Sequence, residues 1–421
     1  MTDAHYIVGD TRDVTRSLPD NSVDLIFTSP PFLALRSYLP ADHPAKAREI
    51  GSESTPAEFL GVLLELVREW ERVLTPTGSL VVELGDTFSG SGGGGGDYLD
   101  GGMREGQQRF AGADASMRES NAAHWRQKNA NRAAWPLAKS LCGIPTLFTW
   151  SLAYGRNLLA PDDTIDPWRI RNVVVWHRPN PPVGALGDKY RPSTSYITVA
   201  TKSAKRWFDL DAVRHEADPA NTRPSALVRQ GIGGRTDQVC NPVGPDGQRI
   251  IANPAGAPPL DAWFDTHDGD DVWTITTDPY KGSHYATFPR ALAARVIDSM
   301  CPRHVCRTCG EPRRREVDVQ GLRGVDMLAV SGANDRGVGL QGARPPMPEI
   351  TRTTTGWSDC GHDDYRPGIV YDPFAGSGTT LAKAIDMGRD AIGADLDERN
   401  ADLARERCGM FLTVDVLEAT S

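Results

Sequence analysis

The sequence predicts an α/β fold, a mixed and mainly parallel doubly wound sheet with helices on both faces. Three observations point to it. An apolar run at 23–27 stops abruptly at a loop, and an amphipathic helix pattern from 55 to 74 leads into a second buried strand at 79–84. From Gly368 the chain closes with strand, loop, helix, strand and helix in succession. Strands that alternate with helices in this way pair in parallel and bury both faces.

Each element expected between residues 5 and 74 has a local cause in the sequence. Residues 5–8 are apolar and β-branched, which predicts a strand. The strand at 23–27 ends because two successive prolines follow it, so a loop begins at Thr28. The helix begins at a capping box over 55–58 with proline at the first helical position, and its apolar residues then recur at helical spacing.

Loop-rich excursions interrupt the middle of the chain. Glycine dominates after the second buried strand, so we expect a mobile excursion over 87–132. Core elements then return as an apolar segment at 144–159 and strands at 173–176 and 196–200. Residues 213–270 are rich in Pro, Gly, Asp and Asn without periodicity and form a second excursion, and 303–366 form a third.

The composition is that of an ordinary globular protein. Of 421 residues, 39% are hydrophobic and 24% charged, and no run approaches the roughly 18 apolar residues of a membrane helix. The N-terminus lacks the basic and apolar regions of a signal peptide, so we expect a cytoplasmic protein that does not contact a membrane. The net charge of −9 is not typical of nucleic-acid binding, but residues 167–240 hold twelve Lys and Arg against six Asp and Glu.

The closing unit predicts a site for a nucleoside cofactor. Asp372 ends its first strand, and Gly376 and Gly378 precede a helix, where glycines let a ligand approach the backbone. Asp395 ends the next strand, at the distance where an acidic residue accepts hydrogen bonds from ribose hydroxyls. A dinucleotide is disfavoured because Leu381 stands where that motif has its third glycine.

A second constellation, Thr28-Ser29-Pro30-Pro31-Phe32, follows the strand at 23–27. Its prolines have no amide hydrogen, so the loop presents only carbonyl oxygens and the Ser29 hydroxyl. These groups can accept both hydrogens of a planar base amine. The amine nitrogen then moves toward tetrahedral geometry, and its lone pair is released to attack a methyl group.

The two constellations together resemble the β-group of DNA amino-methyltransferases, in which a Ser-Pro-Pro-Phe loop precedes an Asp-Pro-Phe-x-Gly-x-Gly cofactor motif. Five further segments resemble segments of this family and follow the family's order, namely 9–10, 84–87, 143–145, 176–180 and 284–289. The resemblance implies the sheet of S-adenosylmethionine-dependent methyltransferases, with the catalytic strand first in the chain. Arg178 and Tyr196 depart from the family pattern, which more often has Lys and Glu there.

The resemblance also implies residue roles. The catalytic residues are Ser29, Pro30, Pro31 and Phe32, with Phe32 stacked on the base. The cofactor-binding residues are Asp10, Thr28, Thr287, Phe288, Pro289, Asp372, Phe374, Gly376, Gly378, Thr379, Asp395 and Leu396.

Ser29 favours the exocyclic N4 of cytosine as the methylated atom, because serine at this position is typical of cytosine-N4 enzymes. Adenine N6 is the alternative. Carbon-5 methylation is excluded, since its thiolate nucleophile follows a proline and no Pro-Cys pair occurs here. A non-catalytic DNA-binding regulator and a methyltransferase of RNA or protein amides are further alternatives.

The expected partner is double-stranded DNA, with the target base flipped out of the duplex. The resemblance implies a bacterial or phage-encoded protein, and a cognate restriction enzyme is a candidate partner. The oligomeric state and the recognition sequence are left open.

The chain is expected to divide into seven parts: the catalytic-loop half (1–86), the glycine-rich insertion (87–132), the core continuation (133–212), the target-recognition insertion (213–270), the cofactor-closing segment (271–302), a zinc-knuckle excursion (303–366) and the cofactor half (367–421).

Four residues in and near the third excursion predict a structural zinc site. Cys306 and Cys309 are separated by two residues and followed by glycine, and Cys360 and His362 complete a set of three sulfurs and one nitrogen. Cys301 and His304 are alternative ligands, and cytosolic thiols without metal are the other interpretation. Such a metal is structural, since methyl transfer from a sulfonium needs no Lewis acid.

Overall fold

A computed structural model describes residues 2–34, 38–39, 42–89, 132–179, 190, 192–214, 272–276, 288–320 and 351–417. Four features singled out by the sequence lie outside these residues: the interior of the 87–132 excursion, nearly all of the 213–270 excursion, residues 321–350 of the 303–366 excursion, and Thr287 with the segment before it. Of the helices in these ranges, none is long and apolar enough to cross a membrane.

The chain divides into two compact units. The first comprises Met1–Phe208, Leu260–Pro312 and His362–Ser421 and contains the large sheet. The second comprises Asp209–Pro259 and Arg313–Gly361, and its described part includes the antiparallel strands β8 (Arg315–Gln320) and β9 (Thr351–Trp357). An ion pair of 2.7 Å between Arg315 and Asp209 anchors this hairpin within its own unit.

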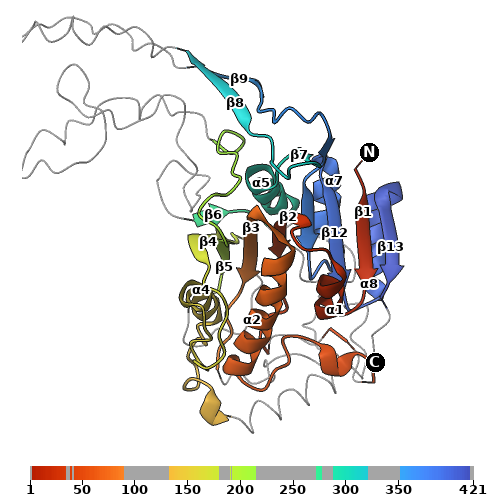
Figure 1. Cartoon of the computed structure of the whole chain (residues 1–421). Helices are drawn as coiled ribbons and strands as arrows, with labels where there is room; N and C mark the ends of the chain where they lie inside the picture. Colours follow the sequence, from red (N-terminus) through yellow and green to blue (C-terminus); the bar gives the residue numbers. More distant parts are fainter. Residues whose placement is uncertain are drawn as a thin grey trace, which may run out of the picture. The chain divides into compact units, whose positions relative to one another are not determined.

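Nine described strands of the first unit form one sheet in the order β13-β1-β12-β11-β2-β3-β5-β4-β6 (Figure 1). Neighbours from β13 to β3 are all parallel, whereas β5 runs antiparallel to both β3 and β4. The predicted mainly parallel sheet is therefore confirmed. Its strands are β1 (Ala4–Val8), β2 (Val23–Thr28), β3 (Leu74–Leu84), β4 (Arg169–His177), β5 (Thr194–Thr201), β6 (Val272–Thr274), β11 (Ile369–Asp372), β12 (Asp390–Asp395) and β13 (Leu412–Val416). A separate two-stranded sheet pairs β7 (Val305–Cys306) with β10 (Tyr365–Arg366).

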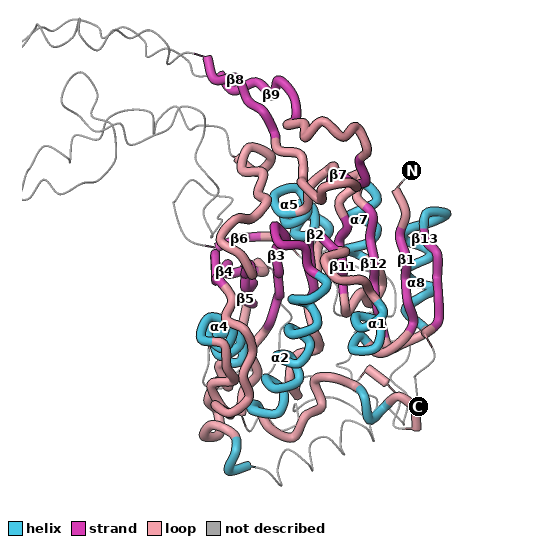
Figure 2. Tube along the Cα trace, in the orientation of Figure 1, coloured by secondary structure: helices cyan, strands magenta, loops and turns pink. Residues whose placement is uncertain are grey.

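Helices cover both faces of the large sheet (Figure 2). Alternation along β2 explains the two layers, because Ile26 packs into one apolar cluster and its neighbours Leu25 and Phe27 into the other. The first cluster contains α1 (Thr11–Ser17), α2 (Pro56–Val73) and α4 (Ile144–Tyr154), and the second contains α5 (Arg290–Met300), α7 (Thr379–Asp386) and α8 (Arg399–Cys408). Short 3₁₀ turns lie at Lys46–Arg48, Arg132–Ala134 and Gly409–Phe411.

The junction of α2 and β3 confirms one expectation and corrects a boundary. Thr55 caps α2 by accepting a hydrogen bond from the Glu58 amide, as the capping box predicts. However, β3 begins at Leu74 and not at 79, directly where the helix ends. Leu74 already pairs with Val23 of β2, and an irregularity in register after that pair absorbs the turn residues. This tertiary pairing has no signature in the local sequence.

The carboxyl ends of four parallel strands meet at one edge of the sheet. Strand β11 lies between β12 and β2, although β2 and β11 are far apart in the chain. From β1 the chain continues to β2 on the opposite side of β11, so the strand order reverses there. Open α/β sheets bind ligands at such a point.

Candidate active site

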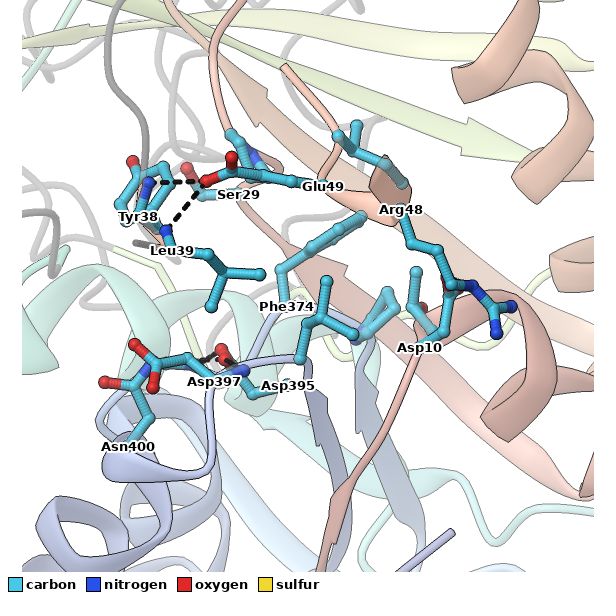
Figure 3. Close-up of a pocket in the computed structure, with 16 residues that line it drawn as sticks. Asp10, Ser29, Tyr38, Leu39, Arg48, Glu49, Phe374, Asp395, Asp397 and Asn400 are labelled. Carbon is cyan, nitrogen blue, oxygen red and sulfur yellow. Dashed lines mark hydrogen bonds and ion pairs between the residues drawn. The ribbon is translucent and has the colours of Figure 1, made fainter. Parts of the chain in front are cut away.

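A crevice of about 720 Å³, open to solvent, lies at this edge (Figure 3). Residues from the ends of β1, β2, β11 and β12 line it together with the segment after β2. The lining consists of Asp10, Thr11, Ser29, Pro31, Tyr38, Leu39, Arg48, Glu49, Ile50, Pro373, Phe374, Gly376, Asp395, Leu396, Asp397 and Asn400.

The crevice brings together seven of the residues that the sequence predicts for the site: Asp10, Ser29, Pro31, Phe374, Gly376, Asp395 and Leu396. It therefore unites the catalytic loop with the cofactor motif. Other predicted residues lie outside its lining: Thr28, Pro30, Phe32, Phe288, Pro289, Asp372, Gly378 and Thr379. Thr287 is outside the described residues.

Ser29 contacts a buried carboxylate that the sequence analysis missed. Its hydroxyl donates a hydrogen bond of 2.5 Å to Oε2 of Glu83 in β3, a side chain that is only 3% exposed. Burial raises the pKa of Glu83, while the neighbouring Ser195 and Ser29 hydroxyls and the Arg178 guanidinium act in the opposite direction. Glu83 directly follows the apolar run Leu80-Val81-Val82 in β3, and a charged residue in a buried strand is a signal that could have identified it.

Phe32 packs against neighbouring residues in this structure, and its predicted stacking on the base stays a prediction. Its ring lies against Gly85 just beyond β3, where an added Cβ would come within 2.4 Å of Phe32 Cε2. The ring also packs against the apolar cluster that includes α2. Because Gly85 has no side chain, the Phe32 ring can pack there and support the catalytic loop.

Asp372 joins the catalytic loop to the cofactor motif. Its Oδ1 accepts hydrogen bonds from the Thr28 hydroxyl at 2.7 Å and the Phe374 amide at 3.1 Å, and its Oδ2 accepts one from the Thr380 hydroxyl at 2.6 Å. The side chain is 1% exposed, and burial raises its pKa to about 6 despite these three donors. Asp372 therefore acts on the crevice through its neighbours.

Asp395 organises the opposite wall of the crevice. Its carboxylate accepts hydrogen bonds from the Gly376 amide at 2.9 Å, the Asp397 amide at 2.8 Å and the Asn400 side chain at 3.0 Å. Burial raises its pKa to about 6. The carboxylate lines the crevice, and its remaining lone pairs can accept a ligand's hydroxyl hydrogens.

The two glycines of the cofactor motif serve different purposes. Gly376 has a φ of +50° and lines the crevice, which fits close approach of a ligand to the backbone. Gly378 has a φ of +75°, and a Cβ there would lie 3.0 Å from the Cβ of Ala404 in α8. The second glycine thus permits close packing of two helices. Thr379, also predicted to bind the cofactor, is buried and accepts a hydrogen bond from Arg407.

Asp10 lies in the crevice, but other groups already engage its carboxylate. It caps α1 by accepting from the Arg12 amide at 2.8 Å, and it forms ion pairs with Arg48 at 2.6 Å and Arg12 at 3.1 Å. Arg48 belongs to a segment whose lining residues the sequence analysis missed, namely Tyr38, Leu39, Arg48, Glu49 and Ile50. This segment has neither regular periodicity nor a known motif, so only the fold reveals its role.

Residues of the predicted cofactor-closing segment are only partly described. Phe288 packs on Phe27 of β2 with ring centroids 4.7 Å apart, and Pro289 immediately precedes α5. Phe288 therefore supports the strand that carries the catalytic loop. Their predicted contact with the cofactor stays a prediction.

The predicted metal ligands of the first unit come together. The ligand atoms of Cys306, Cys309 and His362 lie within 4.8 Å of one another. The fourth predicted ligand, Cys360, is an exposed residue two positions before His362 in the chain. The alternative ligand Cys301 is fully buried, and its sulfur contacts the carbonyl oxygen of Pro302.

At the point where the strand order reverses, the crevice joins the Ser29 loop to the glycine motif, the arrangement expected of an enzyme that binds a nucleoside cofactor. Comparison with known proteins gives the family. The family model described as DNA methylase, for enzymes that act on N6 and N4, matches residues 23–304 and 365–406. The chain belongs to this family and is a DNA amino-methyltransferase.

Sequence similarity to known proteins extends over most of the chain. The Type II methyltransferase M.SmaI of Serratia marcescens is 24% identical over 95% of this chain and 89% of its own length. M.Cfr9I of Citrobacter freundii, also a Type II methyltransferase, is 28% identical over 70% of this chain and 72% of its own. Among solved structures, the cytosine-N4-specific PvuII DNA methyltransferase aligns with 99% of this chain and 95% of its own at 12% identity and a TM-score of 0.45.

Proposed function

We propose that this protein is an S-adenosylmethionine-dependent, Type II DNA methyltransferase that methylates the exocyclic N4 of a flipped cytosine. The observation that carries the proposal is the hydrogen bond from Ser29 to Glu83. Because Glu83 holds the hydroxyl hydrogen, the lone pairs of the Ser29 oxygen are left for a donor in the crevice. The exocyclic amine of a base is such a donor.

The residues of the crevice fit the proposed cofactor. Asp395 presents a carboxylate for ribose hydroxyls, Phe374 presents an aromatic ring for a base, and Gly376 leaves the backbone accessible. When bound, S-adenosylmethionine supplies a methyl group on a positively charged sulfur. Ser29 and Pro31 line the same crevice and would hold the amine beside it.

Glu83 gives the reaction a place for its proton. Methyl transfer would break the bond between the methyl carbon and sulfur, leaving its electron pair on sulfur, as the amine nitrogen bonds to the methyl carbon. The nitrogen must then lose one hydrogen to become neutral again. That N–H bond breaks as the proton passes to the Ser29 oxygen, whose own proton moves to Glu83 over the 2.5 Å hydrogen bond. The raised pKa of Glu83 makes it a stronger base than an exposed glutamate.

Ser29 also supports cytosine over adenine, on the resemblance to cytosine-N4 enzymes at this position. The similarity to Type II methyltransferases over most of the chain supports duplex DNA as the substrate and a restriction endonuclease as the functional partner. A base inside a duplex cannot reach the crevice, so the target base must be flipped.

Product identification tests the proposal. The purified protein is incubated with labelled S-adenosylmethionine and mixed-sequence duplex DNA, which is then digested to nucleosides for mass spectrometry. N4-methylcytosine is the expected product. N6-methyladenine would keep the fold and the proton path but overturn the base assignment. Cofactor binding without any methylated nucleoside would favour a non-catalytic regulator or a substrate other than DNA.

A further inference from the structure

Cys306 and the turn that follows it have the geometry of a metal-binding knuckle, away from the crevice and unused by methyl transfer. Cys306 ends β7, and the backbone amide of Cys309 donates a hydrogen bond to its sulfur at 3.5 Å. The Gly310 amide donates to the Cys306 carbonyl at 3.0 Å, and Gly310 has a φ of +73°. An amide directed at sulfur stabilises the thiolate form, which is the form that binds metals.

His362 reaches the same turn from a distant part of the chain. Strand β7 pairs with β10, where Cys306 lies opposite Tyr365, so the residues just before β10 pass beside the knuckle. The Cys306 sulfur and Nδ1 of His362 are 3.6 Å apart. Zinc bonds of about 2.3 Å to sulfur and about 2.0–2.1 Å to nitrogen, joined at the tetrahedral angle, separate the two ligand atoms by about 3.6 Å. The observed distance therefore matches a tetrahedral site.

We propose that Cys306, Cys309 and His362 bind a structural zinc ion and that Cys360, two residues before His362 in the chain, supplies the fourth ligand. Three soft thiolates and one imidazole in a tetrahedral set select zinc over harder cations. None of the six described cysteines forms a disulfide.

The ion would fix the point at which the chain re-enters the core. Directly after Tyr365, Arg366 donates to the carboxylate of Asp24 at 2.6 Å, and the Ile369 amide donates to the same oxygen at 2.9 Å. Asp24 is buried in β2, the strand that carries the catalytic loop. Holding β7 against β10 therefore holds Arg366 in the position where it neutralises a buried charge.

Metal content tests this proposal without reference to activity. Protein purified without chelators is expected to contain about one zinc ion per chain. Replacement by Co²⁺ is expected to give the strong visible absorption of a tetrahedral, thiolate-bound ion. The Co²⁺ spectrum requires no variant, so it remains informative if the variants fail to fold. Absence of both zinc and this spectrum would overturn the proposal.

Variants identify the ligands. Cys309→Ser and His362→Asn should each lower the zinc content at least about fivefold, while Cys142→Ala, which changes a buried cysteine elsewhere in the core, should leave it unchanged. Cys360→Ser should lose zinc as Cys309→Ser does. Full zinc content in the Cys360 variant would overturn its assignment as the fourth ligand, and equal loss in the Cys142 variant would overturn the whole site.

Discussion

The hydroxyl group of Ser29 has one hydrogen and two lone pairs, and Glu83 accepts the hydrogen. A serine hydroxyl can both donate and accept hydrogen bonds, and here the buried Glu83 carboxylate takes the donated hydrogen. The sequence identifies Ser29 through its position after the strand and before two prolines. The direction of its hydrogen depends on a residue 54 positions away.

Ser29→Ala is expected to lower kcat by about 10²–10³-fold, the range for losing one polar contact that is made in the transition state. The dissociation constant of S-adenosylmethionine should change less than about threefold, because Asp395 and Phe374 are unaffected. Steady-state kinetics and calorimetry measure the two quantities. Ser203→Ala, which changes a half-buried serine after β5 that does not line the crevice, is the control. Equal losses in catalysis and cofactor binding would contradict the role assigned to Ser29.

Glu83→Gln is expected to lower kcat by about 10²-fold and to change its dependence on pH. In the wild type, kcat should fall as the pH falls through the raised pKa of Glu83, because a protonated Glu83 cannot take the proton from Ser29. The acidic limb of the profile should therefore lie above the usual range of a glutamate and disappear in the variant. Glu69→Gln, a surface change in α2, should retain it. A wild-type limb that persists in Glu83→Gln would assign it to another group.

At the scale of elements, Asp372 links β2, β11 and α7 through three hydrogen bonds. The sequence predicts this residue as a direct cofactor ligand. The structure gives it a positioning role in addition to, or in place of, that contact, since it does not line the crevice. The relative position of the catalytic loop and the cofactor motif depends on one buried carboxylate.

Thr28→Val and Thr380→Val form a matched pair that tests this link. Each removes one hydroxyl from Asp372 with little change in shape and should cost about 1–3 kcal/mol in the free energy of unfolding. Thr28→Val, on the catalytic side, should mainly lower kcat, whereas Thr380→Val, on α7, should mainly weaken cofactor binding. Urea unfolding, kcat and the cofactor dissociation constant measure the effects. The same pattern in both variants would mean that Asp372 contributes stability alone.

At the scale of the whole molecule, two buried carboxylates at the active-site edge of the sheet destabilise the folded state when they are charged. Asp372 and Asp395 both have their pKa raised to about 6 from the usual value of 3.8. A raised pKa in the folded state means that the folded protein binds protons more tightly than the unfolded chain. The stability contribution of such a group is therefore greatest below its unfolded pKa and declines as the pH rises to about 6.

Unfolding by urea between pH 4 and 7 checks this expectation. For Asp372 the decline is roughly 3 kcal/mol, from a shift of about two pKa units at 1.36 kcal/mol each. In Asp372→Asn this part of the decline should be absent, so the stability difference between variant and wild type should change across the window and level off above it. Parallel stability curves for the two proteins would contradict a raised pKa at Asp372.

Local sequence patterns predict the class of fold and the two motifs that meet at the crevice. Helical periodicity with a capping box, apolar strands and proline or glycine punctuation are local properties, and they predicted α2, β2 and the closing unit from β11 to α8. The tertiary structure decided what those motifs touch. Glu83, the segment at 38–50, Asn400 and the packing roles of Phe32 and Gly378 depend on residues that are distant in the chain. A side chain's direction and partners are set by which strands become neighbours, and strand pairing leaves no trace in the residues of one strand alone.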